Sequence, residues 1–412
     1  MTGDEVLLGR VVERNAAFLA ADLDGRGIEV TRTQVVPDEL ESIASALRDA
    51  LASGCDLVIT SGGLGPTHDD RTMEAVARST DRPLALDETA LGQVQARVAD
   101  AITRYGIDRA RISAGIEKQA TLPVGGRSLA PIGTAPGCVL VTDQAVIVVL
   151  PGPPAELQPM WWGAVEDPAV AAILEVAPAR SRRTLRMIGV SESELVTARA
   201  HVAEDLVRGV PHGIYTRAGE LDLVIDARPG SEAEADAFAD AICNALGERV
   251  FSRDGRTVDE LVAKRLVARS QTVAVAESCT GGGLGARLTA LPGSSAWFVG
   301  GVIAYSNDAK VALLGVAQGT LDRVGAVSRE TAIEMAQGVR DRTGADWALS
   351  ITGVAGPGGG SPDKPVGLVH IGLAGPFGTS AREVRLTGNR ETVRLRSTTA
   401  AMHDLRAQLM QN

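Results

Sequence analysis

The stretch from Val273 to Lys310 constrains this chain most, because a strand, a glycine-rich loop and a helix follow one another there. An apolar run over residues 272–276 predicts a buried strand, and residues 284–290 predict a helix after the loop. This succession directs backbone N–H groups and a helix N-terminus at one point, which favours an anion such as a phosphate. Glycine-rich loops also serve as plain turns, so the pattern alone leaves both interpretations open.

The same stretch carries side chains suited to acyl transfer. Ser278 and Cys279 follow the strand, and Tyr305 and Lys310 enclose a short polar segment. Serine needs a base to become a nucleophile, and a desolvated lysine can serve as one. Cys279 is a rival nucleophile because thiolates form more easily than alkoxides, but it also fits a small buried apolar position. The residues predict an amide or ester hydrolase, with an exposed helix start near Lys310 as the structural alternative.

Longer motifs in the last third of the chain resemble the C-terminal domain of the CinA family (competence/damage-inducible protein A). They are AESCTGG, PGSS at 292–295, AYSNDAK and SITGVAGPGGG at 350–360. That domain is similar to nicotinamide mononucleotide deamidase, which needs no cofactor. The resemblance implies Ser278 as nucleophile, with Tyr305 and Lys310 as its activating groups. It also implies substrate contacts from Cys279, Thr280, Gly281, Gly282, Asn307, Thr352, Gly353 and Gly356.

Composition limits the remaining function classes. A chain of 412 residues predicts two or three domains, and a formal net charge of −10 argues against a nucleic-acid surface. No run of 18 apolar residues occurs and no signal peptide is recognised, so we expect a cytoplasmic protein without membrane spans. The four cysteines show no CxxC spacing and the five histidines are scattered. We therefore expect reduced thiols and no zinc site.

A second strand, glycine-rich loop and helix occur near the start of the chain. Strands are predicted over residues 28–36 and 55–60, helices over 11–23 and 38–53, and a mostly parallel sheet follows from this alternation. The loop after residue 60 has two interpretations. Thr67 can cap the next helix while Asp69 and Asp70 favour its positive end. Alternatively, the glycines cradle a phosphate and the two carboxylates hold a divalent metal.

GDEVLLG, TSGGLGPTHDD, KQA, IGTAPG and LPGPPAEL resemble the N-terminal domain of the same family. That domain is similar to the molybdopterin-binding fold and is associated with metal-dependent ADP-ribose pyrophosphatase activity. The family has one more strand before the Gly3 segment. It does not occur here, so either the start is truncated or misassigned, or the first strand is lost. The resemblance implies a divalent metal (Mg, Mn or Co) on Asp69, Asp70 and Glu5. It implies nucleotide contacts from Gly62, Gly63, Gly65, Thr67, Lys118, Gly133 and Thr134.

The expected fold class is α/β with three domains. Residues 1–170 should form a molybdopterin-binding-like, doubly wound α/β domain, 181–253 a small α+β domain and 255–412 an α/β deamidase domain. The family has a KH-like middle domain, but this segment is acidic and lacks a GxxG loop, which disfavours RNA. A spacer or dimerisation role is expected, and with it a homodimer.

The end of the chain predicts a long helix capped by Asn389. Its arginines Arg390, Arg394 and Arg396 are interpreted as a solvated face, from which one could reach substrate.

The predicted function lies in pyridine-nucleotide recycling. The last domain would hydrolyse nicotinamide mononucleotide to nicotinate mononucleotide and ammonia, and the first would cleave ADP-ribose. A short-chain dehydrogenase also uses Ser, Tyr and Lys, but that family spaces Tyr and Lys four apart, and Tyr305 and Lys310 are five apart. A further alternative makes the first domain a non-catalytic adaptor that binds a pterin or a nucleotide.

Overall fold

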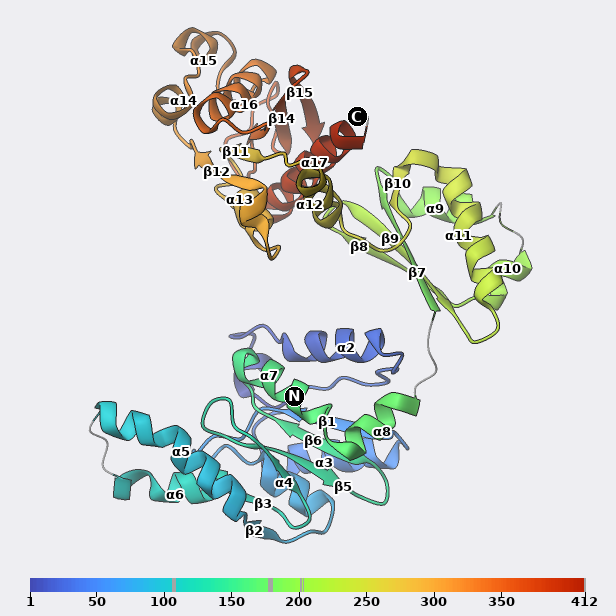
Figure 1. Ribbon diagram of the computed structural model, residues 1–412, viewed down its shortest axis with the longest axis vertical. Helices are drawn as coiled ribbons and strands as arrows, with labels where there is room; N and C mark the ends of the chain where they lie inside the picture. The colour runs from blue at the N-terminus through green and yellow to red at the C-terminus, as the bar shows by residue number, and fades with distance from the viewer. Residues whose placement is uncertain (106–108, 177–180, 201, 203, 411–412) are drawn as a thin grey trace. The chain divides into compact units, whose positions relative to one another are not determined.

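The computed structural model describes the chain except residues 106–108, 177–180, 201, 203 and 411–412. It divides into two compact units, Met1–Arg180 and Ser181–Asn412, which are described separately (Figure 1). Both are mixed α/β structures. None of the described helices is both long and apolar enough to cross a bilayer.

The first unit is built on a four-stranded sheet in the order β1-β6-β5-β4. Only β1 and β6 are parallel, so the sheet is mixed where a mostly parallel one was predicted. Alternate residues of β6 enter opposite cores: Ile147 and Val149 join one cluster, and Val146, Val148 and Leu150 the other. The strands are β1 (Leu57–Ser61), β4 (Arg127–Leu129), β5 (Gly137–Val141) and β6 (Val146–Leu150), with β2 (Leu84–Leu86) and β3 (Thr121–Pro123) as a separate antiparallel pair.

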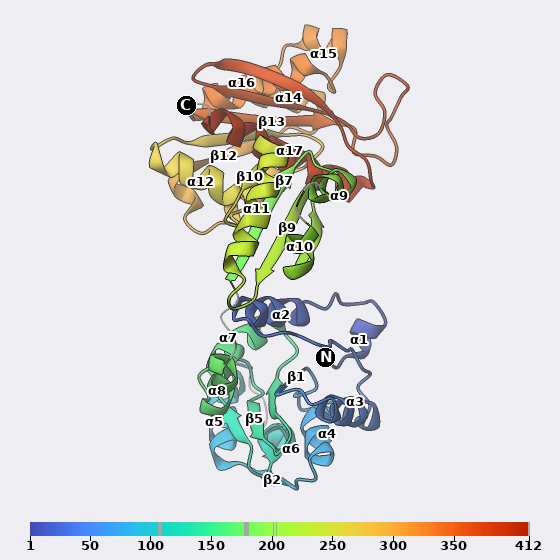
Figure 2. The same ribbon diagram turned by 90° about the vertical axis from the view of Figure 1, so that its right-hand side faces the viewer.

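Helices cover both faces of this sheet (Figure 2). They are α1 (Asp4–Leu7), α2 (Asn15–Gly25), α3 (Leu40–Ala52), α4 (Thr72–Ser79), α5 (Glu88–Tyr105), α6 (Arg109–Gln119), α7 (Pro154–Ala164) and α8 (Pro168–Val176).

The prediction of a strand over residues 28–36 is wrong. Residues 28–35 have no regular structure, and Val36 makes a single parallel bridge to Thr2. A strand forms only where a neighbouring strand is long enough to pair with it. Here the neighbouring segment that pairs with both Val36 and β1 consists of just two residues, Met1 and Thr2. The Met1 carbonyl accepts from the Val36 N–H at 3.0 Å, and the Thr2 N–H donates to Ser61 at 2.9 Å on the other side.

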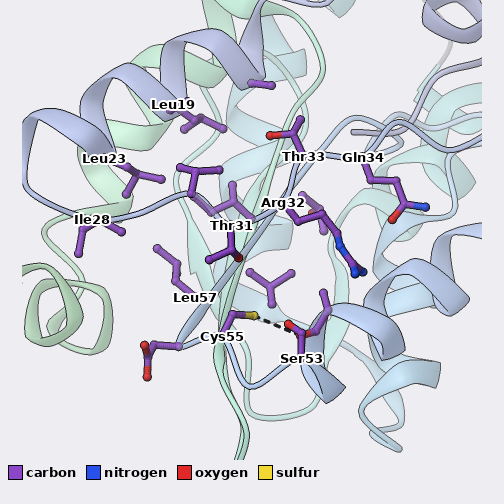
Figure 3. A pocket seen from close by; sticks show the side chains of 18 of the residues that line it. Leu19, Leu23, Ile28, Thr31, Arg32, Thr33, Gln34, Ser53, Cys55 and Leu57 are labelled. Carbon is purple, nitrogen blue, oxygen red and sulfur yellow. Dashed lines mark hydrogen bonds between the residues drawn. The ribbon is translucent and has the colours of Figure 1, made fainter. Parts of the chain in front are cut away.

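An apolar cavity of about 820 Å³ occupies the space beside this short pairing. Figure 3 shows Leu19 and Leu23 of α2, Ile28 and Leu57 around it. β1 is the outer strand of its sheet, so the edge that faces this region has no strand partner among the described residues. Met1 and Thr2 lie along this edge and also line the cavity.

We expect a strand-forming extension to stabilise the first unit. Five apolar, β-branched residues joined ahead of Met1 should pair with β1, bury the cavity lining and raise the melting temperature by several degrees, since burial stabilises by about 25 cal/mol per Å² of apolar surface. A Gly-Ser extension of equal length is the control. Equal melting temperatures for the two extended proteins in calorimetry would show that the cavity does not accept a strand.

The second unit contains two sheets. The first has the order β10-β7-β9-β8 and carries helices on one side. Two helices follow β7, and residues 201 and 203 between them lie outside the described part. The elements are β7 (Ser181–Ile188), α9 (Glu192–Ala200), α10 (Glu204–Gly209), β8 (His212–Arg217), β9 (Glu220–Ala227), α11 (Glu232–Leu246), a short 3-10 turn (Gly247–Arg249) and β10 (Val250–Ser252).

The other sheet has the order β12-β11-β13-β14-β15, with β11 parallel to both of its neighbours. Val273 and Val275 of β11 join the core under α12, α13 and α17, while Ala274 and Ala276 join the core under α14 and α16 (Figure 2). The strands are β11 (Val273–Glu277), β12 (Phe298–Ile303), β13 (Trp347–Gly353), β14 (Leu368–Gly375) and β15 (Gly378–Arg385).

The helices of this part are α12 (Val258–Ala268), α13 (Gly283–Thr289), α14 (Asn307–Leu314), α15 (Gln318–Val324), α16 (Arg329–Thr343) and α17 (Arg390–Met410), with a 3-10 turn at Ser294–Ala296. Thr257 and Glu260 form a capping box at the start of α12.

Candidate functional site

Three parallel strands end at one edge of the last sheet. Ser278 directly follows β11, Ala304 follows β12, and the loop from Gly353 follows β13. Because carboxyl ends of parallel strands meet at the same edge, segments far apart in sequence come together there (Figure 1). The glycine-rich loop, the Tyr305–Lys310 segment and the Gly353–Gly360 segment therefore surround one point.

Glu277 shapes the glycine-rich loop. Its carboxylate is 1% exposed and accepts the N–H groups of Gly282 at 3.1 Å, Leu284 at 2.9 Å and Gly285 at 2.8 Å. The N-terminal donors of α13 are therefore already bound by an internal anion. This corrects the prediction that this helix terminus receives a phosphate: the donors of Gly282 are not free for a ligand.

The Lys310 amine lies at the centre of the site. Its Nζ is 3.1 Å from Ser278 Oγ, 2.9 Å from the Ala304 carbonyl and 3.1 Å from the Tyr305 carbonyl. The side chain is 1% exposed, and no carboxylate of the described chain pairs with it. Burial lowers the pKa of Lys310, against a smaller opposing effect of Cys279.

A neutral amine fits these three contacts. It has two N–H donors, which match the two carbonyls, and one lone pair, which matches the hydroxyl of Ser278. Lys310 can therefore accept the serine proton, as a general base must. The predicted pairing of Ser278 with Lys310 is thus present in the folded chain.

Cys279 lacks this arrangement. Burial raises the pKa of the Cys279 thiol to about 11, so the sulfur is protonated at neutral pH. Its side chain is 7% exposed and belongs to the apolar core beneath the loop. Between the two candidate nucleophiles, the geometry favours the Ser278 hydroxyl, and Cys279 acts as a buried apolar side chain.

Two main-chain donors remain beside the nucleophile. The Ser278 N–H donates to Ile351, and the Gly281 N–H donates back to Ser278 at 3.1 Å. Within the described chain, no oxygen accepts the N–H groups of Cys279 and Thr280. A pair of free donors next to a nucleophilic oxygen is the arrangement that stabilises an oxyanion.

Other predicted contacts lie differently. The Tyr305 hydroxyl, on a side chain that is 63% exposed, is 3.4 Å from an Arg390 nitrogen, and only the Tyr305 main-chain carbonyl contacts Lys310. Thr352 donates its hydroxyl to Ala326 at 2.7 Å and is buried, so it points away from the loop. Asn307 is exposed at the first position of α14.

The arginines of α17 were predicted to form a solvated face, and Arg390 is exposed while Arg394 and Arg396 are half-buried. Arg390 donates to the Gly356 carbonyl at 2.7 Å, and Arg394 donates to the Thr280 carbonyl at 2.7 Å. Only Arg396 contacts its own segment, at Thr387. The spacing of the arginines in the sequence could have indicated this difference. Arg390 and Arg394 are four residues apart and share one face of the helix, whereas Arg396 lies off that face.

The first unit holds a second candidate site. The predicted loop glycines line a cavity of about 350 Å³. Its lining includes Gly62, Gly63, Gly65, Glu5, Asp38, Asp69, Asp70, Gln119, Thr134 and Glu156. The Thr134 hydroxyl accepts a hydrogen bond from the Gln119 amide at 3.3 Å. Gly133 packs against the side chain of Glu156. The Lys118 amine donates to the Thr67 carbonyl.

The carboxylates of this cavity do not fit a divalent metal. Within the described residues, no three His, Cys, Asp or Glu side chains are arranged to hold one. Asp70 accepts the Thr67 N–H at 2.9 Å and the Thr67 hydroxyl at 2.5 Å, so it closes its own loop. Burial, with added repulsion from Glu5, Asp4 and Asp69, raises the pKa of Asp38. The set Glu5, Asp69 and Asp70 thus lines one cavity without forming a ligand sphere.

Comparison with known proteins agrees with this architecture. Residues 1–171 match the model of a probable molybdopterin binding domain, and residues 255–409 match that of the CinA C-terminal domain. A CinA-like protein of Mycolicibacterium vanbaalenii is 44% identical over 413 residues, which cover 99% of this chain and 97% of the relative. The chain belongs to the CinA family. A CinA-like protein of Mycobacterium tuberculosis is 42% identical over 421 residues, covering 99% of this chain and 96% of the relative.

Solved structures are similar to part of this CinA-family chain. The competence/damage inducible protein CihA from Agrobacterium tumefaciens is 42% identical and covers 37% of this chain and 96% of its own, with a TM-score of 0.35. A CinA protein from Thermoplasma acidophilum is 36% identical and covers 41% of this chain and 95% of its own, with a TM-score of 0.36.

Proposed function

We propose that this CinA-family protein hydrolyses the carboxamide of nicotinamide mononucleotide to nicotinate mononucleotide and ammonia. The observation that carries the proposal is the contact between the buried Lys310 amine and Ser278 Oγ, at 3.1 Å. A serine with a neutral lysine base is suited to acyl transfer from an amide. The nucleotide itself comes from the family resemblance. The cytoplasmic location and the homodimer, which were expected from the sequence, stay predictions.

In the first half-reaction, Ser278 Oγ attacks the amide carbon and its proton passes to Lys310 Nζ. The oxyanion accepts hydrogen bonds from the N–H groups of Cys279 and Thr280, each worth about 3 kcal/mol in comparable sites. The C–N bond then breaks, Lys310 returns the proton to the leaving nitrogen, and ammonia departs. An ester joins the substrate acyl group to Ser278.

In the second half-reaction, water attacks this ester. Lys310 takes a proton from the water, and the oxyanion occupies the same two donors. The ester bond breaks, Lys310 gives the proton to Ser278 Oγ, and the carboxylic acid leaves. The sum is one amide and one water converted to one acid and one ammonia, with the serine and the lysine restored.

Substitutions at the three central side chains should separate serine from thiol chemistry. We expect Ser278→Ala and Lys310→Met to lose several orders of magnitude in ammonia release, to a similar extent, because residues that act as a unit are not additive. Cys279→Ala should keep most activity. The measurement is steady-state ammonia release from nicotinamide mononucleotide, with melting temperature as a check on folding.

Lys264→Met, at an exposed lysine of α12, is the matched control and should behave as wild type. An inactive but folded Cys279→Ala protein beside an active Ser278→Ala protein would reverse the assignment and make the enzyme a thiol amidase.

For the first unit we propose nucleotide binding in the 350 Å³ cavity beside the Gly62–Gly65 loop. Metal-dependent cleavage of ADP-ribose, with Mg, Mn or Co, is the competing proposal that the family resemblance implies. The carboxylates favour binding without cleavage, because Asp70 is engaged by Thr67 and no ligand set is arranged among the described residues.

We therefore expect ADP-ribose to bind without release of AMP, whether or not Mg²⁺, Mn²⁺ or Co²⁺ is added. Calorimetry measures the binding, and chromatography of the nucleotides measures the cleavage. Asp70→Asn should lower the melting temperature of the first unit, since it weakens the hydrogen bonds that Asp70 accepts from Thr67, and should leave deamidation unchanged. Metal-dependent AMP release that Asp69→Asn abolishes would establish the pyrophosphatase instead.

A further inference from the structure

A buried carboxylate lies directly before the nucleophile. Glu277 is the last residue of β11 and is 1% exposed, and no lysine, arginine or histidine of the described chain forms an ion pair with it. Its hydrogen-bond donors are the N–H groups of Gly282, Leu284 and Gly285. A buried charge without a cation is costly even when such donors hold it. The proposed hydrolysis uses no proton of this carboxylate, so its position needs another explanation.

The main-chain N–H groups of the loop divide into two sets. Within residues 278–285, those of Cys279 and Thr280 have no acceptor oxygen in the described chain. The N–H groups that have acceptors are those of Ser278, Gly281, Gly282, Gly283, Leu284 and Gly285. Glu277 alone accepts three of them. The carboxylate therefore holds the part of the loop that directly follows the two free donors.

The direction of a free donor depends on the bonds of its neighbours. A peptide group is planar and trans, so its carbonyl and its N–H point in opposite directions. The Ser278 carbonyl accepts the Gly281 N–H at 3.1 Å, which turns the Cys279 N–H of the same peptide group the other way. Gly281 and Gly282 both have positive φ, and glycine has other conformations within easy reach. This loop needs an anchor, and the carboxylate that binds the Gly282 N–H supplies it.

We propose that Glu277 is a positioning residue of the oxyanion site, whose charge fixes the loop so that the N–H groups of Cys279 and Thr280 stay directed at the reacting oxygen. The proposal rests on the amide hydrolysis proposed for Ser278 and deepens it. The two carboxylate oxygens accept all three N–H groups at once. A neutral amide offers one acceptor oxygen, and its NH₂ group would oppose the third N–H.

Glu277→Gln tests the charge with little change in shape. We expect kcat for nicotinamide mononucleotide to fall about 100-fold, the order for one lost oxyanion donor, with KM changed less than about threefold, because these donors act in the transition state. Asp346→Asn is the matched control. Asp346 accepts the Thr272 N–H at 2.8 Å, at the opposite end of β11. This variant should lower the melting temperature and leave kcat unchanged.

A pH profile separates positioning from simple loss of the loop. When a fluorophosphonate modifies Ser278, the new O–P bond forms, fluoride leaves, the proton passes to Lys310, and charge develops on the phosphoryl oxygen. In Glu277→Gln the plateau rate should fall at least about tenfold, while the midpoint stays that of the wild type because Lys310 stays buried. A midpoint moved up to the ordinary lysine value would overturn the proposal, because it would show that the loop no longer covers Lys310. Unchanged kcat and an unchanged plateau rate would overturn it as well.

The labelling also separates this proposal from the amidase assignment. If the wild-type protein releases no ammonia from nicotinamide mononucleotide, the proposed substrate fails, and the plateau rate alone decides the role of Glu277. If the reagent does not modify wild-type Ser278, both proposals fail.

A second variant guards against loss of the fold. If Glu277→Gln does not fold, Glu277→Asp should show the same losses, since it keeps the charge but is one carbon shorter and withdraws from the donors. If neither variant folds, Glu277 supports the fold as a whole, and its role as a positioning residue is overturned.

Discussion

The site depends on one buried amine. Lys310 Nζ contacts two main-chain carbonyls and the Ser278 hydroxyl, on a side chain that is 1% exposed. An ammonium there would lose its hydration with no carboxylate of the described chain to compensate, so burial favours the neutral form. The carbonyls of Ala304 and Tyr305 then hold the nitrogen with its lone pair toward the serine. The chemistry proposed here follows from that arrangement.

The sheet supplies the position of these groups, and Glu277 supplies the shape of the loop. β11 lies between two parallel neighbours, which brings the serine, the lysine segment and the Gly353 loop to one edge. Glu277 binds the N–H groups at the start of α13, and Gly281 and Gly282 have φ values of 58° and 93° that other residues rarely adopt. This leaves the donors of Cys279 and Thr280 for an oxyanion.

Much of this arrangement was predictable from local sequence. The apolar runs of β11 and β13 and the polar residues that follow them locate the site, because burial and strand formation are local signals. The partners of those residues were less accessible. Arg390 and Arg394 reach the site only because α17 packs on the sheet, and the use of the α13 donors by Glu277 depends on a carboxylate five residues upstream turning into the loop. The prediction of a strand over residues 28–36 failed for a similar reason. A strand depends on a neighbouring strand, which the local sequence does not reveal.

The most direct test of the account is the ionisation of Lys310 as reported by Ser278. The rate at which a fluorophosphonate modifies Ser278 can be followed by peptide mass spectrometry as a function of pH. A base must be neutral to accept the serine proton, so the rate should rise with pH through the lowered pKa of Lys310. The account predicts a midpoint clearly below 10.5, the ordinary lysine value, and no such rise in Lys310→Met. A midpoint at the ordinary lysine value, or a label on Cys279 in place of Ser278, would contradict it.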